Sequence, residues 1–190
     1  MNLDSEKMLL GAVRSLAAAV DAKDPYTQAH SERVSRYAQK MARLLGLGEH
    51  EVEAVGLAAL MHDIGKIGIE DYILRKSGPL TDDEYEIMKT HPIKGAQIME
   101  PFEPLKDVIP GVKYHHENVD GTGYPEGLKG DEIPYPAKII SVAETFDAMT
   151  TNSPHQKAKG ASYVVDRMRR LIGTKFDAEI VEALARSLSI

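Results

Sequence analysis

Histidines and carboxylates are the residues of this sequence whose types and spacing could support metal chemistry. The 190 residues include seven histidines and no cysteine, so a metal ion would have to bind through nitrogen and oxygen. Such ligands suit a pair of divalent transition ions, and iron, manganese, nickel and zinc are all chemically acceptable. Two such ions acidify a water molecule and hold the oxygens of a phosphodiester, which indicates metal-assisted hydrolysis of a phosphate ester. The candidate ligands are His30, His62-Asp63, His91, His115-His116 and the acid Glu144.

Each of these positions also has a plainer interpretation when it is taken alone. His62-Asp63 fits a helix-terminal histidine that interacts with the helix dipole beside a solvated aspartate. His30 lies on an apolar helical stripe, where a hydrogen-bonded core histidine is the usual finding, and His91 fits a capping or surface residue. His115-His116 fits a partly exposed pair with one buried member. The metal hypothesis therefore depends on the combination of these residues.

Lys66 and two acids extend the candidate site. A turn at Gly65 would bring Lys66 back toward the cleft of the histidines, where its ammonium group could anchor an anion. Glu144 and Asp147 lie three residues apart in a segment that is apolar almost all round. Burying a carboxylate is costly unless it is paired or coordinated. At least one of these acids therefore needs a cation, either a metal ion or a neighbouring Lys or Arg.

Helices joined by short connections are expected to position these residues, because no alternating apolar and polar run is long enough to demand a sheet. Sequence signals for helix ends are Gly46, the Thr81-Asp82-Asp83-Glu84 capping box, and Pro92 and Pro136 in first turns, with Asp177 as a cap. One predicted helix ends near Gly46, and the next runs over about 49–62. Further helices are predicted to start at 81, 92 and 136, and another covers roughly 105–116. Two more helices are predicted to close the chain. The predicted fold class is all-α.

The segment 117–134 is predicted to be a long loop. It contains four glycines and two prolines, which rules out regular structure. Loops longer than about 12 to 15 residues are usually functional or disordered. This segment begins directly after His115-His116.

Length, composition and charge narrow the class of protein. The chain is long enough for one domain, and its 43% hydrophobic and 27% charged residues are typical of a globular protein with a sizeable core. The formal charge of −6 argues against binding to a nucleic acid polymer. No apolar run approaches the length of a membrane span, and residues 1–22 make a poor signal peptide. The cytoplasm is the expected compartment.

Several motifs, in order, resemble the HD-GYP domain, a branch of the HD superfamily of metal-dependent phosphohydrolases that is associated with cyclic di-GMP. The resemblance extends over most of the chain. The matching motifs are 26–34, Leu60-Met61-His62-Asp63-Ile64-Gly65-Lys66-Ile67-Gly68-Ile69, 91–95, His115-His116-Glu117, Asp120-Gly121-Thr122-Gly123-Tyr124-Pro125, 127–130, 133–134 and Val142-Ala143-Glu144-Thr145-Phe146-Asp147-Ala148.

The resemblance implies an all-α HD-domain helical bundle of about seven to nine helices. It implies a single domain over 1–190, with an N-terminal helix in 1–25, a metal and substrate core in 26–152 and C-terminal helices in 153–190. The expected cofactors are two divalent transition-metal ions, iron or manganese before nickel or zinc. The implied metal ligands are His30, His62, Asp63, His91, His115, His116 and Glu144, with Asp63 bridging.

The resemblance also implies roles for residues at the substrate. Asp63 and Lys66 are the expected catalytic residues, and Lys66 would hold the substrate phosphate. The other implied substrate-binding residues are Arg33, Asp147, Gly123, Tyr124 and Pro125. The Gly123-Tyr124-Pro125 loop is also the expected contact for a signalling protein. The implied reaction is hydrolysis of a cyclic dinucleotide, cyclic di-GMP first among them, to linear pGpG and further to GMP.

The sequence departs from the family pattern at a few positions. Glu144 stands where the family usually has Asp, and Ser153 and Gln156 replace basic residues that are expected to contact phosphates. Tyr26 stands where some members carry a Glu that supports a third metal, so two metals are expected. Two alternatives therefore stay open: a degenerate domain that binds a ligand or a protein without turnover, and a phosphohydrolase with another phosphate ester as substrate. The sequence leaves open the oligomeric state, and whether the chain is an excised output domain or a stand-alone one.

Overall fold

The computed structural model describes residues 3–23, 29–152 and 157–190, and the structural statements below concern these ranges. Their α-helices are α1 (Leu3–Lys23), α2 (His30–Leu44), α3 (Glu49–Met61), α4 (Asp71–Leu74), α5 (Asp82–Met88), α6 (His91–Met99), α7 (Ile109–Tyr114), α8 (Tyr135–Thr150), α9 (Ala161–Arg169) and α10 (Ala178–Ser187). Three short 3-10 helices are η1 (Ile64–Gly68), η2 (Glu103–Leu105) and η3 (Gly130–Glu132). These ranges contain no strand, only two isolated bridges, so the predicted all-α fold is confirmed.

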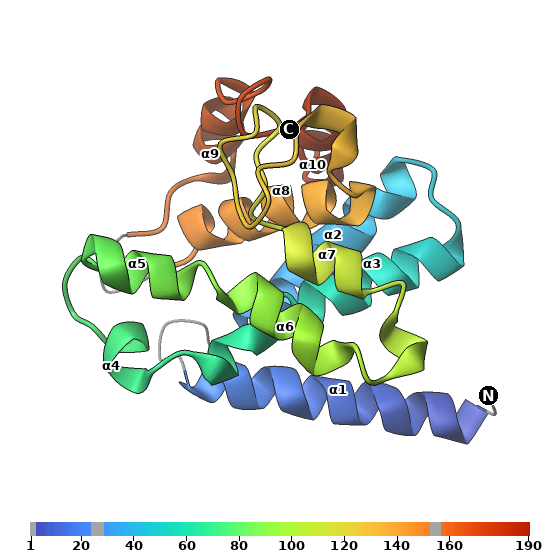
Figure 1. Ribbon diagram of the computed structural model, residues 1–190. Coiled ribbons are helices and arrows are strands. Elements are labelled where there is room, and N and C mark those ends of the chain that lie inside the picture. Colours follow the sequence, from blue (N-terminus) through green and yellow to red (C-terminus); the bar gives the residue numbers. More distant parts are fainter. Residues whose placement is uncertain (1–2, 24–28, 153–156) are drawn as a thin grey trace.

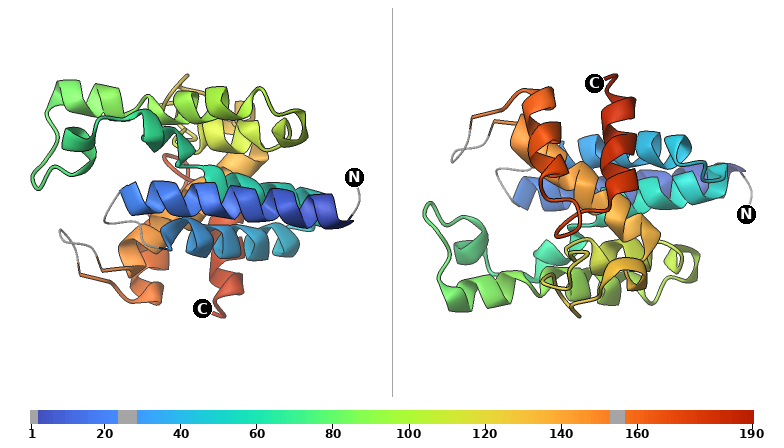
Figure 2. Two further views of the ribbon diagram at one scale, coloured as in Figure 1. Left: turned by 90° about the horizontal axis from the view of Figure 1, so that it is seen from below. Right: turned by 90° about the horizontal axis from the view of Figure 1, so that it is seen from above.

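The helices form a bundle around α2, α3 and α8 (Figure 1). α2 packs against both α3 and α8, and α7 also packs against α3 and α8. α9 and α10 cover α8 at one end of the molecule, and α1 runs along the opposite end, where it contacts η1, α2 and α3. The two further views show α4 and α5 projecting to one side of this bundle (Figure 2).

One large apolar core holds the bundle together, and a small one lies under the projection. In the large core, small side chains such as Ala38 on α2 and Ala59 on α3 have no exposed surface, which lets the two helix backbones approach closely. Phe146 on α8 is among the largest fully buried side chains. The small core is formed by Ile69, Ile73 and Leu74 beneath α5, so the α4–α5 projection has packing of its own.

Most of the predicted helix ends are confirmed. The Thr81 hydroxyl accepts a hydrogen bond from the Glu84 amide, and the Glu84 carboxylate accepts one from the Thr81 amide. Pro92 and Pro136 lie in the first turns of α6 and α8, and the Asp177 carboxylate caps α10 by accepting from the amide of Glu179. Gly46 follows α2 with a φ of 82°, a left-handed conformation that glycine adopts without strain.

The predicted helix over 105–116 is wrong in extent. The segment begins as η2, and α7 starts only at Ile109. Pro110 explains the difference, because it lacks an N–H and restricts the residue before it, and so it fits a first turn but not a helix interior. α4, η1 and η3 were not predicted as helices, and η3 lies in the segment 117–134, for which no regular structure was expected. With the four-residue α4 set aside, nine longer α-helices remain within the described ranges, at the upper end of the predicted number.

Some of the expectations concern residues or boundaries that the structure does not describe. Tyr26, Ser153 and Gln156 lie outside the described residues. The boundaries of the predicted single domain stay a prediction. Among the described helices, none is both long and apolar enough to cross a membrane.

Candidate metal centre

The predicted ligands stand at the ends of helices that converge on one point. His62 follows the last residue of α3, and Asp63 precedes η1. His30 and His91 are the first residues of α2 and α6, and His115 follows the last residue of α7. Side chains at the ends of different helices can meet at one point while the backbone hydrogen bonds within each helix stay intact. Residues that are far apart in the sequence therefore share one buried site.

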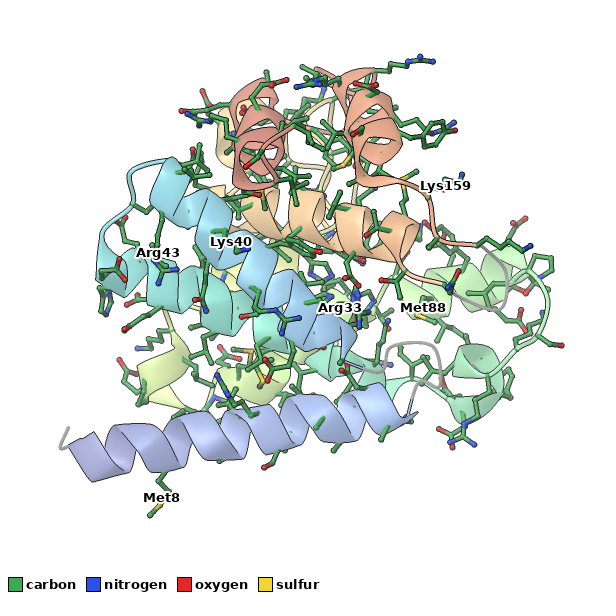
Figure 3. All side chains as sticks on the ribbon, turned by 180° about the vertical axis from the view of Figure 1, so that it is seen from behind. Met8, Arg33, Lys40, Arg43, Met88 and Lys159 are labelled. Atoms are coloured by element: carbon green, nitrogen blue, oxygen red, sulfur yellow. The ribbon has the colours of Figure 1, made fainter. Side chains whose placement is uncertain are left out.

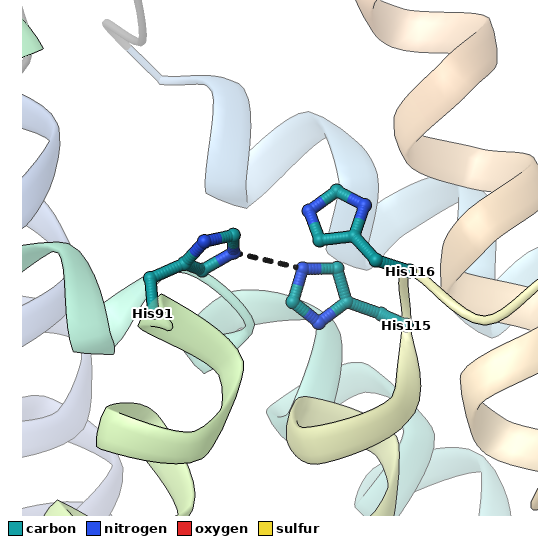
Figure 4. A group of neighbouring side chains, drawn as sticks. All are labelled: His91, His115 and His116. Carbon is teal, nitrogen blue, oxygen red and sulfur yellow. Dashed lines mark hydrogen bonds between the residues drawn. The ribbon is translucent and has the colours of Figure 1, made fainter. Parts of the chain in front are cut away.

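Two groups of three side chains can each hold a metal ion. Within each group, the ligand atoms all lie within 4.8 Å of one another. The first group is His30, His62 and Asp63, and the second is His91, His115 and His116. Figure 4 shows the second group, with His91 on α6 facing His115 and His116 at the end of α7.

Asp63 connects the two groups through its two carboxylate oxygens. Oδ2 lies 3.5 Å from Nε2 of His62 in the first group, and Oδ1 lies 3.4 Å from Nε2 of His91 in the second. A carboxylate with one oxygen toward each group is the arrangement that a ligand shared by two ions requires. The same Oδ2 accepts a hydrogen bond from Nζ of Lys66 at 2.8 Å.

Backbone carbonyls fix the orientation of three of the histidines. Nδ1 of His62, His91 and His115 lies 2.6, 2.8 and 2.7 Å from the carbonyl oxygen of Ala59, Met88 and Val112, respectively. Because a carbonyl only accepts, Nδ1 of each ring carries the proton and donates it. Nε2 is then a lone pair that faces the site, as in histidines that bind metals.

The lone pairs on these three Nε2 atoms show that the site fits a cation. Nε2 of His62 is buried and has no hydrogen-bond partner among the described residues. Nε2 of His91 and Nε2 of His115 face each other at 3.3 Å, an arrangement of two lone pairs that a shared cation relieves. The donor set of imidazole nitrogens and carboxylate oxygens therefore suits divalent transition ions.

Burial and charge keep the site in the protonation state that metal binding needs. Burial, with the neighbouring His116, holds the pKa of His115 well below its ordinary value. Burial also lowers the pKa of His91 and, well below its ordinary value, that of His116. Burial alone would raise the pKa of Asp63, but the positive charge of Lys66 leads the effects that outweigh burial and hold that pKa well below its ordinary value. Neutral imidazoles beside an ionised carboxylate are ready ligands.

Asp147 supports His30 from behind. Its Oδ2 lies 2.8 Å from Nδ1 of His30, and Arg33 donates to Oδ1 from Nε at 2.6 Å and to Oδ2 from a terminal nitrogen at 3.0 Å. Burial alone would lower the pKa of His30, but the hydrogen bond to Asp147 raises it. Asp147 is 1% exposed, and both its oxygens bind protein groups, so the geometry gives it a supporting position behind a ligand. Its partner Arg33 lies on α2 (Figure 3).

Glu144 lies at the edge of the second group. Its Oε2 is 3.9 Å from Nδ1 of His116, and about a quarter of each of these two side chains is exposed. It stands on α8 one helical turn before Asp147. The second group is therefore more open to solvent than the first, whose His62 is fully buried.

The loop over 117–134 packs onto the second group. The Tyr124 ring stacks on the His116 ring, with centroids 4.7 Å apart and planes at 29°. The Tyr124 amide donates to the carbonyl of His116 at 3.2 Å. A Cβ at Gly123 would overlap backbone atoms of His116, Glu117 and Asn118. Gly123 is therefore required for this close approach, and Tyr124 forms a wall of the site.

Glu117 organises this loop, a role that the sequence reasoning missed. Its side chain is buried, and Oε1 accepts from the amides of Glu126 and Gly127 at 2.8 and 3.1 Å. Oε2 accepts from the amide of Leu128 at 3.1 Å. The available signal was an acid placed directly between two histidines and a glycine-rich segment, where backbone amides need an acceptor.

Gly65 sets the spacing between Asp63 and His91. A Cβ at this position would overlap the His91 carbonyl and crowd the Gly95 amide. η1 and α6 therefore pack backbone against backbone, which brings Asp63 within reach of His91. The turn that was expected at Gly65 serves helix packing, and Lys66 follows it with its ammonium group on Asp63.

Comparisons with known proteins identify the family of this chain. A family model described as HD domain matches residues 14–180. The chain is similar to the 3'3'-cGAMP-specific phosphodiesterase 3 of Vibrio cholerae, with 37% identity over 94% of this chain and 39% of that protein. It is also similar to the cyclic di-GMP phosphodiesterase response regulator RpfG of Xanthomonas campestris, with 39% identity over 90% of this chain and 46% of that protein. The chain thus spans less than half the length of either relative.

A solved structure shares the fold. A cyclic GMP-AMP specific phosphodiesterase of V. cholerae superposes with a TM-score of 0.75 at 19% identity, over 94% of this chain and 48% of that one. At this identity the likeness concerns the fold alone, and it agrees with the helical bundle described above. With the family model matching most of its residues and the motifs at the candidate metal centre in order, the chain belongs to the HD domain family and is of the HD-GYP type.

Proposed function

We propose that this chain is a metal-dependent phosphodiesterase that hydrolyses a cyclic dinucleotide to its linear form. Cyclic di-GMP is the first candidate substrate, with pGpG and then GMP as products, and 3'3'-cGAMP is the second. The observation that carries the proposal is the position of Asp63, with one oxygen toward each group of histidines. The names of the relatives support the class of substrate. A cytoplasmic location is part of the proposal.

Two divalent ions, iron or manganese first, are the proposed cofactors. His30, His62 and Asp63 would hold one ion, and the other would be held by His91, His115 and His116 with Asp63 shared and Glu144 at the edge. When bound, such ions acidify a water molecule and neutralise charge on the oxygens of a phosphodiester. The hydrogen bonds from Nδ1 to backbone carbonyls orient the rings for this task.

Lys66 is the proposed anchor for the scissile phosphate. Its ammonium group lies 2.8 Å from Oδ2 of Asp63, and its side chain is partly exposed, so it sits between the buried ligands and solvent. An ammonium has three donors, and one of them can be directed to a phosphate oxygen beside Asp63. Such a charge-assisted bond strengthens as negative charge develops on the phosphoryl group.

The loop that contains Tyr124 is proposed to line the substrate cleft. Tyr124 covers His116, and Glu117 holds the loop in place from below. Gly123 permits the packing. Gly123, Tyr124 and Pro125 are all partly exposed, and all three are proposed substrate contacts. Contact between this loop and a signalling protein remains a proposal. Arg33, on the exposed side of Asp147, is the proposed further contact to a phosphate.

One observation favours a second candidate, a domain that binds ligands without turnover. Glu144 is the residue that departs from the usual Asp, and it is the only proposed ligand among the described residues that belongs to neither group of three. If it fails to hold an ion, the second group would lack its carboxylate from α8. This alternative predicts ligand binding without product under any divalent metal.

The test combines metal analysis and turnover on the same sample. The chain is purified without oxygen, its metals are counted, and cyclic di-GMP and 3'3'-cGAMP are offered separately. Asp63→Asn keeps the shape of the side chain but removes its charge, and Asp107→Asn at an exposed position is the control. We expect two metals per chain and linear product for the parent protein and the control, and loss of both in Asp63→Asn. Full turnover by Asp63→Asn would contradict the mechanism.

Competition separates the substrate classes. Cyclic di-GMP is added to a generic chromogenic phosphodiester substrate. Inhibition at micromolar concentration with formation of pGpG supports the proposal. Binding of cyclic di-GMP with hydrolysis of neither compound favours the binding module, and hydrolysis of the generic substrate without any competition favours another phosphate ester.

A further inference from the structure

Lys23, in the last turn of α1, binds the backbone of the turn that follows Asp63. Its Nζ donates to the carbonyl oxygens of Ile67 at 2.9 Å and Ile69 at 2.7 Å, and it lies 3.3 Å from that of Lys66. The Asp71 carboxylate, at 3.4 Å, is a fourth oxygen neighbour. The ammonium group therefore contacts four oxygens of one short segment.

This arrangement satisfies carbonyls at the C-terminal end of η1, of which that of Lys66 also accepts from the amide of Ile69 at 3.1 Å. The last carbonyls of a helix have no partner within it and carry partial negative charge. Lys94, on α6, donates to the remaining carbonyl of the series, that of Gly68, at 2.7 Å. Lysines from two different helices thus bind the four consecutive carbonyls 66–69. Bonds from an ammonium group are stronger than those between neutral groups, so they hold η1 between α1 and α6.

The same turn of α1 contacts the segment that carries His30. Asp21 accepts a hydrogen bond from the hydroxyl of Ser31 at 2.8 Å, and Ser31 is buried directly after His30. Asp21 and Lys23 therefore join the beginning of α2 to the end of η1, and these two elements lie beside the first group. Neither side chain belongs to a group of metal ligands.

We propose that Lys23 is a positioning residue that sets the location of Lys66 at the substrate phosphate. It acts through the backbone, since it binds the carbonyl of Lys66 itself while the Lys66 ammonium reaches Asp63 from the same turn. This inference rests on the proposed function. Because Lys23 lies in the last turn of α1, the position of α1 should affect the rate of phosphodiester hydrolysis.

The test compares Lys23→Met with Lys23→Arg. Methionine keeps the length of the side chain and removes every donor, whereas arginine keeps the charge and the donors. Lys40→Met, at an exposed lysine on α2 (Figure 3), is the matched control. The readouts are kcat and KM for the cyclic dinucleotide, the metal content, and amide hydrogen exchange of η1 in the full chain.

For Lys23→Met we expect unchanged metal content and a kcat lower by roughly tenfold to a hundredfold, because small misplacements of a catalytic group are costly. KM should change by less than about threefold, since the interaction matters most in the transition state. The amides of Lys66 and Ile69 should exchange at least about tenfold faster, while those of α2 keep their rates. Lys23→Arg should restore a large part of both effects, and Lys40→Met should show neither.

The hydrogen-exchange readout keeps this inference separate from the proposed function. If the parent protein gives no product, the proposed function fails, and faster exchange confined to η1 still supports the role of Lys23 in holding the turn. Unchanged exchange and unchanged kcat in Lys23→Met would overturn the positioning role. A uniform loss of stability with equal exchange in α2 and η1 would also overturn it, since Lys23 would then be a general structural residue.

Discussion

Asp147 and His30, 117 positions apart in the sequence, are joined by a contact of 2.8 Å between a carboxylate oxygen and Nδ1 of the ring. The same carboxylate binds Arg33 through two further hydrogen bonds. The contact orients the ring of His30 so that its other nitrogen faces the first metal group. A carboxylate behind a ligating histidine fixes its tautomer and strengthens it as a ligand.

Asp147→Asn should therefore weaken metal binding at the first group. The amide keeps the size of the side chain but loses the charge that supports His30 and Arg33. We expect the affinity for the metal ion to fall by about 10- to 100-fold, measured by competition with a chelating dye. Asp166→Asn, at an exposed position on α9, is the control. Equal affinity in Asp147→Asn and the control would show that His30 needs no support from α8.

Glu117→Gln should loosen the loop above His116. The glutamine side chain keeps one acceptor oxygen and turns an amide group toward backbone N–H donors, so hydrogen bonds to a buried carboxylate are lost. Such bonds are worth about 1.5 to 3 kcal/mol, and we expect the free energy of unfolding to fall by about 2 kcal/mol. The amides of Glu126, Gly127 and Leu128 should exchange faster. Denaturant unfolding and hydrogen exchange measure the two effects.

The control for the loop variant is Glu100→Gln, at an exposed position after α6. It should leave both the free energy of unfolding and the loop amides unchanged. If Glu117→Gln behaves like this control, the carboxylate does not hold the loop in solution.

Gly65→Ala should separate η1 from α6. The added Cβ would meet the His91 carbonyl, which is backbone and cannot rotate away. Overpacking of this kind costs typically 1 to 3 kcal/mol, so we expect a loss of about 2 kcal/mol in the free energy of unfolding, with reduced metal content. Gly78→Ala is the matched control, since its Cβ would meet nothing within 4 Å. Both are read by denaturant unfolding and metal analysis. Metal content equal to that of the control would show that the separation of Asp63 and His91 can relax.

Metal removal should proceed in two phases. His116 and Glu144 are partly exposed, whereas the side chains of His62 and Asp63 are almost completely buried. A chelator therefore reaches the second group first, and the ion at the first group should leave more slowly. Native mass spectrometry during incubation with EDTA should show a population with a single ion before the metal-free form. Simultaneous loss of both ions would contradict this order.

The helical fold could be predicted because its signals are local. Thr81 and Glu84 cap a helix through residues three apart, and prolines mark the first turns of α6 and α8. Pro110 gave the same signal for α7, and the expectation of a longer helix over 105–116 ignored it. The 3-10 helix η1 is too short for a periodic pattern, and its shape depends on lysines from α1 and α6.

The candidate site could be predicted in membership but not in geometry. Residue types and the family resemblance indicated six residues that the structure brings into two groups. The division into these groups depends on where helix ends meet, which the sequence does not encode locally. The partners of Asp147 and the role of Glu117 depend on long-range contacts with His30 and on the path of a loop. The assignment of the candidate residues as metal ligands, catalytic residues and substrate-binding residues stays a prediction.

Glu117 is bonded through one peptide unit to His116, so the loop and the second metal group share a covalent anchor. A partner that shifted the Glu117 carboxylate would therefore also shift the backbone next to His116, a proposed metal ligand. Thermodynamic linkage makes this relation reciprocal: a partner that binds the metal-loaded form more tightly raises metal affinity by the same factor. If the proposed signalling protein binds this loop, its binding and the metal occupancy of the second group would be coupled in both directions.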